Sequence, residues 1–191
     1  IEDRAAVLAK MRSVKSKAEQ KMLRKAAEIS KVAYDAMLRS VEPGQTEWDV
    51  METLEHGYRS NGSRGPGYNT IVGAGLNGTV LHYIANDQPI GDGDLIVIDS
   101  GADYGGYTAD VTRTIPANGK FSPRHKEIYN LVLKALDASI KATKPGTTFA
   151  KIDKASRDLI TKAGYGDTFI HGIGHHLGLE VHDITPEDRK S

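Results

Sequence analysis

The feature that most constrains the fold is a helix–stop–helix pattern that occurs twice in the chain. PGQT at 43–46 separates two helical patterns, and PGTT at 145–148 does the same in the second half. In each case Pro-Gly ends one helix and Thr can accept the backbone hydrogen bonds that begin the next. This repeat predicts two related α+β halves, with a cleft between them that suits a functional site. The alternative is that Pro-Gly-x-Thr is only a common way to end one helix and start another.

The spacing of apolar residues predicts the elements around these stops. Steps of three and four are typical of a buried helix face, and short β-branched runs bounded by Gly or Asp are typical of strands. The predicted helices run over 17–41, from Thr46 to about Gly62, from Ser122 to the stop at 145–146, and from Thr148 to Gly164. The segment 67–75 predicts a strand that leads into a glycine turn, and 94–114 predicts two strands around a tight turn.

Composition excludes several classes of protein. Lys+Arg and Asp+Glu both number 25 in 191 residues, so the formal net charge is zero, which argues against a nucleic-acid partner. Cysteine is absent, which excludes disulfides and thiolate zinc sites and fits a reducing compartment. No long apolar run or signal peptide is found, so a cytoplasmic protein without a membrane partner is expected. Because the chain starts at Ile1 rather than Met, we expect a processed or trimmed piece.

Two aspartates flank the predicted tight turn. If the turn is centred between Tyr104 and Gly105, Asp99 and Asp110 face each other about 5 Å apart across the ladder. Carboxylates this close repel each other unless a cation or a shared proton relieves them, and two-metal sites require such bridging carboxylates. The alternative is that both are solvated turn residues, as we expect for Asp103.

Four of the seven histidines lie in the stretch HGIGHHLGLEVHD near the end of the chain. His171 and His175 have the spacing of a zinc-binding pair on a helix, but the three glycines make a helix unfavourable. An extended path would place these two on one face, with His176 on the other and His182 beyond a bend at Gly178.

A further histidine, His82 in LHYIAND, lies between the first predicted strand and Asp99. Alone it would be unremarkable. Together with the aspartates and the C-terminal histidines it gives a mixed oxygen and nitrogen ligand set, which suits Mn, Co or Zn. The high share of carboxylates favours Mn.

These residues stand in a recognisable context. GPGYNTIVGAGLNGTVLHY, DGDLIVIDSGADYGGYTADVTRTIP and HGIGHHLGLEVHD resemble successive signatures of the dinuclear metallopeptidases with the pita-bread fold, in the aminopeptidase P and prolidase branch. The resemblance runs through almost the whole chain. It implies an α+β fold with two pseudo-symmetric halves and helices packed on a curved, mainly antiparallel sheet. It also implies release of an N-terminal residue that precedes proline, with a water held between two divalent ions as the nucleophile.

The resemblance implies a role for each of seven side chains. Three would be metal ligands, namely Asp99, Asp110 and His175. Three would contact the substrate, move protons or stabilise developing charge, namely His82, His171 and His182. Tyr68 would line the substrate pocket.

One departure limits this prediction. The family places two more ligands, both glutamates, in motifs well after VHD, whereas this chain ends at Ser191 and Glu187 lacks their context. We therefore expect 17–191 to be a partial catalytic domain without its last strands, after a linker or first-helix segment at 1–16, and to be inactive or weakly active alone. A prolidase that takes only Xaa-Pro dipeptides and a non-catalytic peptide-binding module are the alternatives, and a homo-oligomer is left open.

Overall fold

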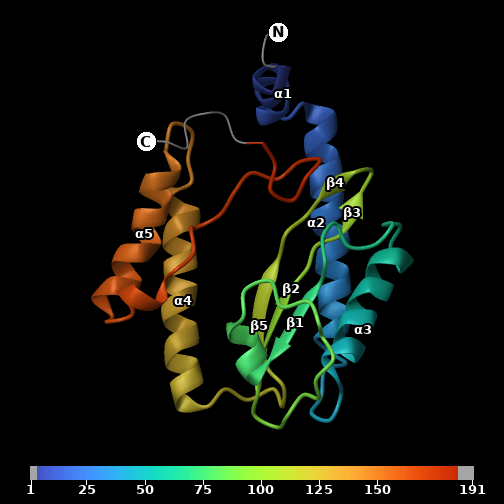
Figure 1. Ribbon diagram of the computed structural model, residues 1–191, viewed down its shortest axis with the longest axis vertical. Coiled ribbons are helices and arrows are strands. Elements are labelled where there is room, and N and C mark those ends of the chain that lie inside the picture. Colours follow the sequence, from blue (N-terminus) through green and yellow to red (C-terminus); the bar gives the residue numbers. More distant parts are fainter. Residues whose placement is uncertain (1–3, 185–191) are drawn as a thin grey trace. The chain divides into compact units, whose positions relative to one another are not determined.

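The chain is described by a computed structural model over residues 4–184, shown in Figure 1. Its elements, in order, are α1 (Arg4–Ser13), α2 (Lys17–Met37), α3 (Glu47–Ser60), β1 (Ile71–Ala74), the 3₁₀ turn η1 (Gly75–Thr79), β2 (Leu95–Asp99), β3 (Asp103–Tyr104), β4 (Tyr107–Thr108), β5 (Thr112–Pro116), α4 (Pro123–Ala142), α5 (Phe149–Lys162) and the 3₁₀ turn η2 (Gly166–Thr168). The described residues divide into a first unit, 4–120 with 176–184, and a second unit, 121–175. Within residues 4–184, every helix is too short or too polar to span a bilayer.

The helix starts follow the caps expected from the sequence. The Thr46 side chain accepts a hydrogen bond from the Asp49 backbone, as predicted, and the Asp49 side chain accepts one from the Thr46 backbone, which completes a capping box at the start of α3. Thr148 caps α5 in the equivalent place. The helix before Thr46 ends at Met37 rather than at the predicted Val41. Val41 still packs against the core, so the apolar pattern continues past the end of the helix.

Replacing Thr46 with Ala is expected to lower the free energy of unfolding by about 1 kcal/mol, because the first turn of α3 loses its side-chain acceptor. Urea denaturation followed by circular dichroism measures this loss. Thr53→Ala is the matched control, since Thr53 lies inside α3, where Ala is a better helix former. Equal destabilisation by both substitutions would contradict the capping account.

The sheet of the first unit is antiparallel with the strand order β1-β2-β5. Asp99, the last residue of β2, pairs with Ile71 on one side and with Thr112 on the other. The short strands β3 and β4 continue the same ladder into a hairpin in which Tyr104 pairs with Tyr107. The strands predicted within 67–75 and 94–114 are therefore present.

The predicted centre of the hairpin turn is wrong by one residue. The turn lies between Gly105 and Gly106, whose φ angles are 63° and 83°. A two-residue turn with positive φ at both positions favours glycine at both, because only glycine adopts that conformation without steric cost. Asp99 is consequently opposite Thr112. The sequence analysis had placed it opposite Asp110.

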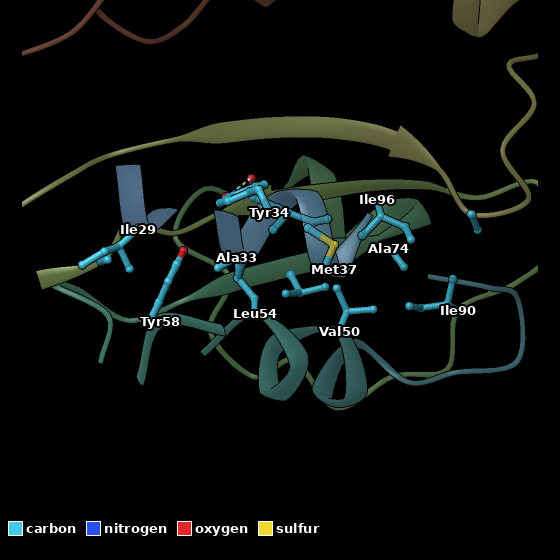
Figure 2. Close-up of a cluster of buried hydrophobic side chains, with 14 residues drawn as sticks. Ile29, Ala33, Tyr34, Met37, Val50, Leu54, Tyr58, Ala74, Ile90 and Ile96 are labelled. Carbon is cyan, nitrogen blue, oxygen red and sulfur yellow. Dashed lines mark hydrogen bonds between the residues drawn. The ribbon is translucent and has the colours of Figure 1, made fainter. Parts of the chain in front are cut away.

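The core of the first unit lies where α2 and α3 pack against the sheet. Figure 2 shows side chains from the two helices facing one another: Ile29, Ala33, Tyr34 and Met37 from α2, and Val50, Leu54 and Tyr58 from α3. Gly57 of α3 permits the close approach, since a Cβ there would lie 2.7 Å from the Cβ of Ala33. This packing holds β1 and β2 in place; Asp99 is the last residue of β2, and Tyr68 lies shortly before β1.

The second unit contains the paired helices α4 and α5. Ser139 of α4 is buried and donates a hydrogen bond to the carbonyl of Ile152 in α5 at 3.1 Å. The apolar spacing within 122–144 predicted a buried helix face that includes Val132, Leu136 and Ile140, and this prediction is wrong for these three exposed side chains.

The strand expected after α5 is not present among the described residues. Residues 169–175 form neither helix nor strand, and the second unit offers no other strand with which an extended segment could pair. The two halves therefore share the helix–stop–helix order but not a described sheet. Residues 4–13 form a helix of their own, and the predicted domain boundary after residue 16 stays a prediction.

Candidate functional site

Three of the predicted site residues meet in the first unit. The hydroxyl of Tyr68 lies 2.6 Å from Oδ1 of Asp99 and 3.0 Å from Oδ1 of Asp110. The two carboxylates are therefore within two hydrogen-bond lengths of each other. They meet diagonally across the ladder rather than directly opposite, because Asp110 lies two residues before Thr112.

The local charge balance suits a cation. Burial raises the pKa of Asp99, and the negative charge of Asp110 raises it further, although the hydrogen bond from Tyr68 acts in the opposite direction. Burial and the same two carboxylates raise the pKa of Tyr68, so its hydroxyl keeps its proton. One phenol proton cannot satisfy two carboxylates at once. Paired carboxylate oxygens of this kind fit a hard or borderline divalent ion, which would remove the repulsion.

A glycine allows the two backbone segments that carry Asp99 and Asp110 to lie close together. The ladder continues beyond β2 through the Ser100 amide, which donates to Val111, and the Ala109 amide, which donates to Ala102. Gly101 lies between these bonds, and a Cβ on it would collide with the backbone carbonyl of Ala109. The glycine is therefore required by a close approach of two backbones, and that approach brings Asp110 to Asp99.

His82 lies on the loop between η1 and β2 of the same unit and is exposed. Its φ angle is +56°, which is uncommon for a residue other than glycine. A positive charge on His82 is the smallest of the effects on the pKa of Asp99, and it acts to lower it. A role for His82 beside the carboxylate pair stays a prediction.

His171 and His175 belong to the second unit. His171 is exposed, its Nδ1 lies 2.7 Å from the carbonyl of Gly172, and its own carbonyl accepts a hydrogen bond from Arg157 at 3.2 Å. His175 is half-buried. Residues 169–175 form no helix, as the glycines predicted, and no strand either. The predicted placement of His171 and His175 on one face stays a prediction. A shared metal site with Asp99 stays a prediction.

Among the described residues, no group of three or more His, Cys, Asp and Glu side chains is arranged to hold an ion. The metal-ligand roles of Asp99, Asp110 and His175 stay predictions.

His182 lies in the first unit, beside a buried ion pair that the sequence analysis missed. The neighbouring Asp183 has a side chain that is 1% exposed; it accepts a hydrogen bond from Lys15 at 2.6 Å and another from Arg12. A Cβ on Gly178 would overlap the Asp183 carboxylate, so glycine is needed at that bend. No pattern in the sequence pointed to this contact, because its partners are separated by more than 160 residues.

Acid is expected to weaken the first unit through this ion pair. Burial alone raises the pKa of Asp183, but the hydrogen bonds from Lys15 and Arg12 outweigh it and hold the pKa below the usual value. An unfolded aspartate titrates near about 3.9, so the unfolded chain binds more protons below that pH than the folded chain does. The stabilisation is complete above about pH 5 and is lost as the pH falls through the folded-state pKa.

Urea unfolding at pH 7 and at pH 3.5 tests this, with the fluorescence of Trp48, the only tryptophan, reporting on the first unit. Asp183→Asn should lower stability at pH 7 and should make the difference between the two pH values smaller. Asp35→Asn is the matched control, since Asp35 forms only an exposed ion pair with Lys31 and should change little. An unchanged pH dependence in Asp183→Asn would contradict the assignment.

Comparison with known proteins identifies the family. Residues 21–190 match metallopeptidase family M24. The chain belongs to metallopeptidase family M24. This M24 chain is 38% identical to the Xaa-Pro aminopeptidase of Escherichia coli, a match that covers 93% of this chain and 44% of that protein. It is also 38% identical to the Xaa-Pro dipeptidase of Pyrococcus furiosus, with 93% and 51% covered. The M24 chain thus spans about half the length of the curated relatives it matches.

Solved structures of M24 relatives share its fold. The prolidase from Pyrococcus furiosus has a TM-score of 0.89 at 38% identity, with 95% of this chain and 54% of that chain covered. Escherichia coli aminopeptidase P in complex with substrate has a TM-score of 0.87 at 37% identity, with 96% and 46% covered. A zinc-substituted form of the same aminopeptidase, in complex with product, has a TM-score of 0.88. The predicted pita-bread fold and the aminopeptidase P and prolidase branch are confirmed.

Proposed function

We propose that this M24 chain is part of a metal-dependent aminopeptidase that releases the N-terminal residue of peptides with proline in the second position. The observation that carries the proposal is the pair of carboxylates, Asp99 and Asp110, brought together at one phenol hydroxyl. The names of the relatives, Xaa-Pro aminopeptidase and Xaa-Pro dipeptidase, support the choice of substrate.

Asp99, Asp110 and His175 would hold two divalent ions, with further ligands from outside this chain. Manganese is the proposed metal because carboxylate oxygens dominate the set, with cobalt and zinc as alternatives. When bound, such ions lower the pKa of a coordinated water and make it a nucleophile near neutral pH. The chain's own contribution is to hold the two carboxylates together through Tyr68, which stays protonated and lines the same site.

Three histidines, His82, His171 and His182, would act on the peptide substrate. Hydrolysis adds the hydroxyl of water to the carbonyl carbon and a proton to the proline nitrogen, which leaves as a secondary amine. Like the nitrogen of any amide, the leaving proline nitrogen must receive a proton, and a nearby donor can supply it. His82 is proposed to contact the peptide and assist this transfer, His182 to stabilise the charge that develops on the carbonyl oxygen, and His171 to lie near the substrate.

Calorimetric titration with Mn²⁺ and hydrolysis of Xaa-Pro peptides test the proposal together. The chain as given is expected to bind Mn²⁺ weakly and to cleave slowly or not at all. The same chain extended beyond Ser191 along its source gene should bind two ions and cleave. If the extended protein neither binds ions nor cleaves, the enzyme proposal is wrong and a non-catalytic peptide-binding module replaces it.

Substrate length separates the two activities within this proposal. Cleavage of Xaa-Pro peptides of three or more residues supports the aminopeptidase, whereas activity restricted to Xaa-Pro dipeptides supports a prolidase. The homo-oligomer, the cytoplasmic location and the lack of a nucleic-acid partner stay predictions. Gel filtration with light scattering decides the first of these.

A further inference from the structure

A buried carboxylate outside the metal site organises the loop that carries His82. Glu47 is the first residue of α3 and is 0% exposed. A carboxylate removed from water is costly unless hydrogen bonds replace its hydration. Its position in the first turn of a helix is favourable for a negative charge, but that alone does not satisfy two oxygens.

Four neutral donors satisfy the Glu47 carboxylate. Oε1 accepts hydrogen bonds from the Ala74 amide at 2.8 Å and the Asn77 side chain at 2.9 Å. Oε2 accepts hydrogen bonds from the Tyr83 hydroxyl at 2.7 Å and the Gln88 amide at 3.1 Å. One donor is the last residue of β1 and the other three lie between β1 and β2, so the carboxylate joins residues that are up to fourteen positions apart in the sequence.

The donors lie on both sides of His82. Ala74 and Asn77 precede it, Tyr83 follows it directly, and Gln88 lies further along the same loop. The Asn77 side chain also donates to the Tyr83 hydroxyl at 3.1 Å, so the two arms of the loop are tied to each other as well as to Glu47. Burial and the hydrogen bond to Glu47 raise the pKa of Tyr83 to about 12, which keeps this donor protonated.

The held segment includes two uncommon backbone conformations. His82 has a φ of 56°, and the buried Asn86 has a φ of 49°. Asn86 is fixed separately, since its side chain accepts from the Val72 amide and donates to the Thr70 carbonyl, both at 2.8 Å. Left-handed conformations of residues other than glycine persist only where the surroundings hold them. At His82 the nearest restraint along the sequence is the adjacent Tyr83, whose hydroxyl donates a hydrogen bond to Glu47.

We propose that Glu47 is a positioning residue that holds the loop on both sides of His82, fixes its left-handed backbone and thereby sets the direction of its imidazole. This inference rests on the proposed function only for the consequence in catalysis, because the positioning itself is a property of the first unit. If Glu47 only stabilised the fold, its substitution would change the His82 signals no more than it changes those of other residues.

Two variants disrupt the hydrogen bonds of the Glu47 carboxylate and keep nearly the same side-chain volume. Glu47→Gln keeps the size but replaces one acceptor oxygen with an NH₂ group that faces donors. Tyr83→Phe removes a single donor and leaves the carboxylate in place, so it serves if Glu47→Gln does not fold. Glu52→Gln is the matched control, since Glu52 lies on the same helix and is exposed.

The first readout is on the chain itself, without metal. NMR spectra of ¹³C- and ¹⁵N-labelled histidine, with the His82 signal assigned from its loss in His82→Gln, should show a shifted or broadened ring resonance in Glu47→Gln and Tyr83→Phe. Amide exchange at 75–88 should accelerate at least about tenfold, while amides of β2 and β5 keep their protection. Unchanged His82 signals and exchange in both variants, or changes equal to those in Glu52→Gln, would overturn the proposal.

The second readout uses the extended, metal-loaded protein. Glu47→Gln should lower kcat/KM by about tenfold to a hundredfold, and should add nothing further when His82 is already Ala. Independent, multiplying effects would show that Glu47 does not act through His82 and would overturn the proposal. If the extended wild-type protein does not cleave at all, the proposed function fails, and the NMR measurement still decides whether Glu47 positions His82.

Discussion

Asp99→Asn in the extended protein is expected to abolish metal-dependent cleavage of Xaa-Pro peptides. We expect kcat/KM to fall more than about a hundredfold, because the loss of a residue that only supports a metal ligand already lowers metal affinity or activity about 10–100-fold. Asn keeps the size of the side chain and its oxygen can still accept the hydrogen bond from Tyr68. It removes the negative charge that would hold a divalent ion against Asp110. The loss should therefore appear in Mn²⁺ affinity, measured by calorimetry, as well as in the rate.

The control for this substitution is Asp92→Asn, which changes an exposed aspartate in the turn before β2. Mn²⁺ binding and cleavage should be unchanged in that variant. Asp99→Asn should also fold at least as well as the wild type, because it removes one of two repelling carboxylates. Full activity in Asp99→Asn would exclude the carboxylate pair as a metal site.

Gly101→Ala is expected to lower the free energy of unfolding by about 3 kcal/mol or more, at the upper end of the usual cost of overpacking. The added methyl group would collide with the backbone carbonyl of Ala109, and backbone cannot move aside as a flexible side chain can. The ladder between Ser100 and Val111 would have to open. Urea denaturation followed by Trp48 fluorescence measures the effect in the first unit.

Gly172→Ala is the matched control, because a Cβ at Gly172 has no atom within 4 Å and no positive φ opposes it. That variant should be close to neutral. If Gly101→Ala is equally neutral, the close approach at the hairpin is not what brings Asp110 to Asp99. The Gly101 variant should also weaken Mn²⁺ binding in the extended protein, since opening the ladder moves the two carboxylates apart.

Local rules predicted most of the elements. Thr46 and Thr148 cap helices because each has an oxygen that reaches the free amides of a first turn, and this depends only on residues three positions ahead. The strand ending at Asp99 was recognisable from its β-branched run. The same kind of local reasoning misplaced the hairpin turn, because three candidate residues, Tyr104, Gly105 and Gly106, adjoin, and only the positive φ angles decide between them.

The candidate site was predictable where the residue types themselves suggest the chemistry. Asp99, Asp110 and Tyr68 do meet, and they were selected from carboxylate spacing and from a family resemblance. Glu47 was not selected, since a glutamate in the first turn of a helix is ordinary in sequence and its burial depends on a loop more than twenty residues away. Asp183 was missed for the same reason, as its cationic partners lie at the other end of the chain.

The contact of Asp183 with Lys15 and Arg12 has a consequence for the order of events during synthesis. The first unit takes its last residues from 176–184, after the whole of 121–175 has been made. While the ribosome is still adding those residues, the two cations remain hydrated and the Thr108 amide lacks its Gly178 acceptor. The first unit can therefore gather its helices and sheet early, but Asp183 joins it only after residues 121–175 have been made.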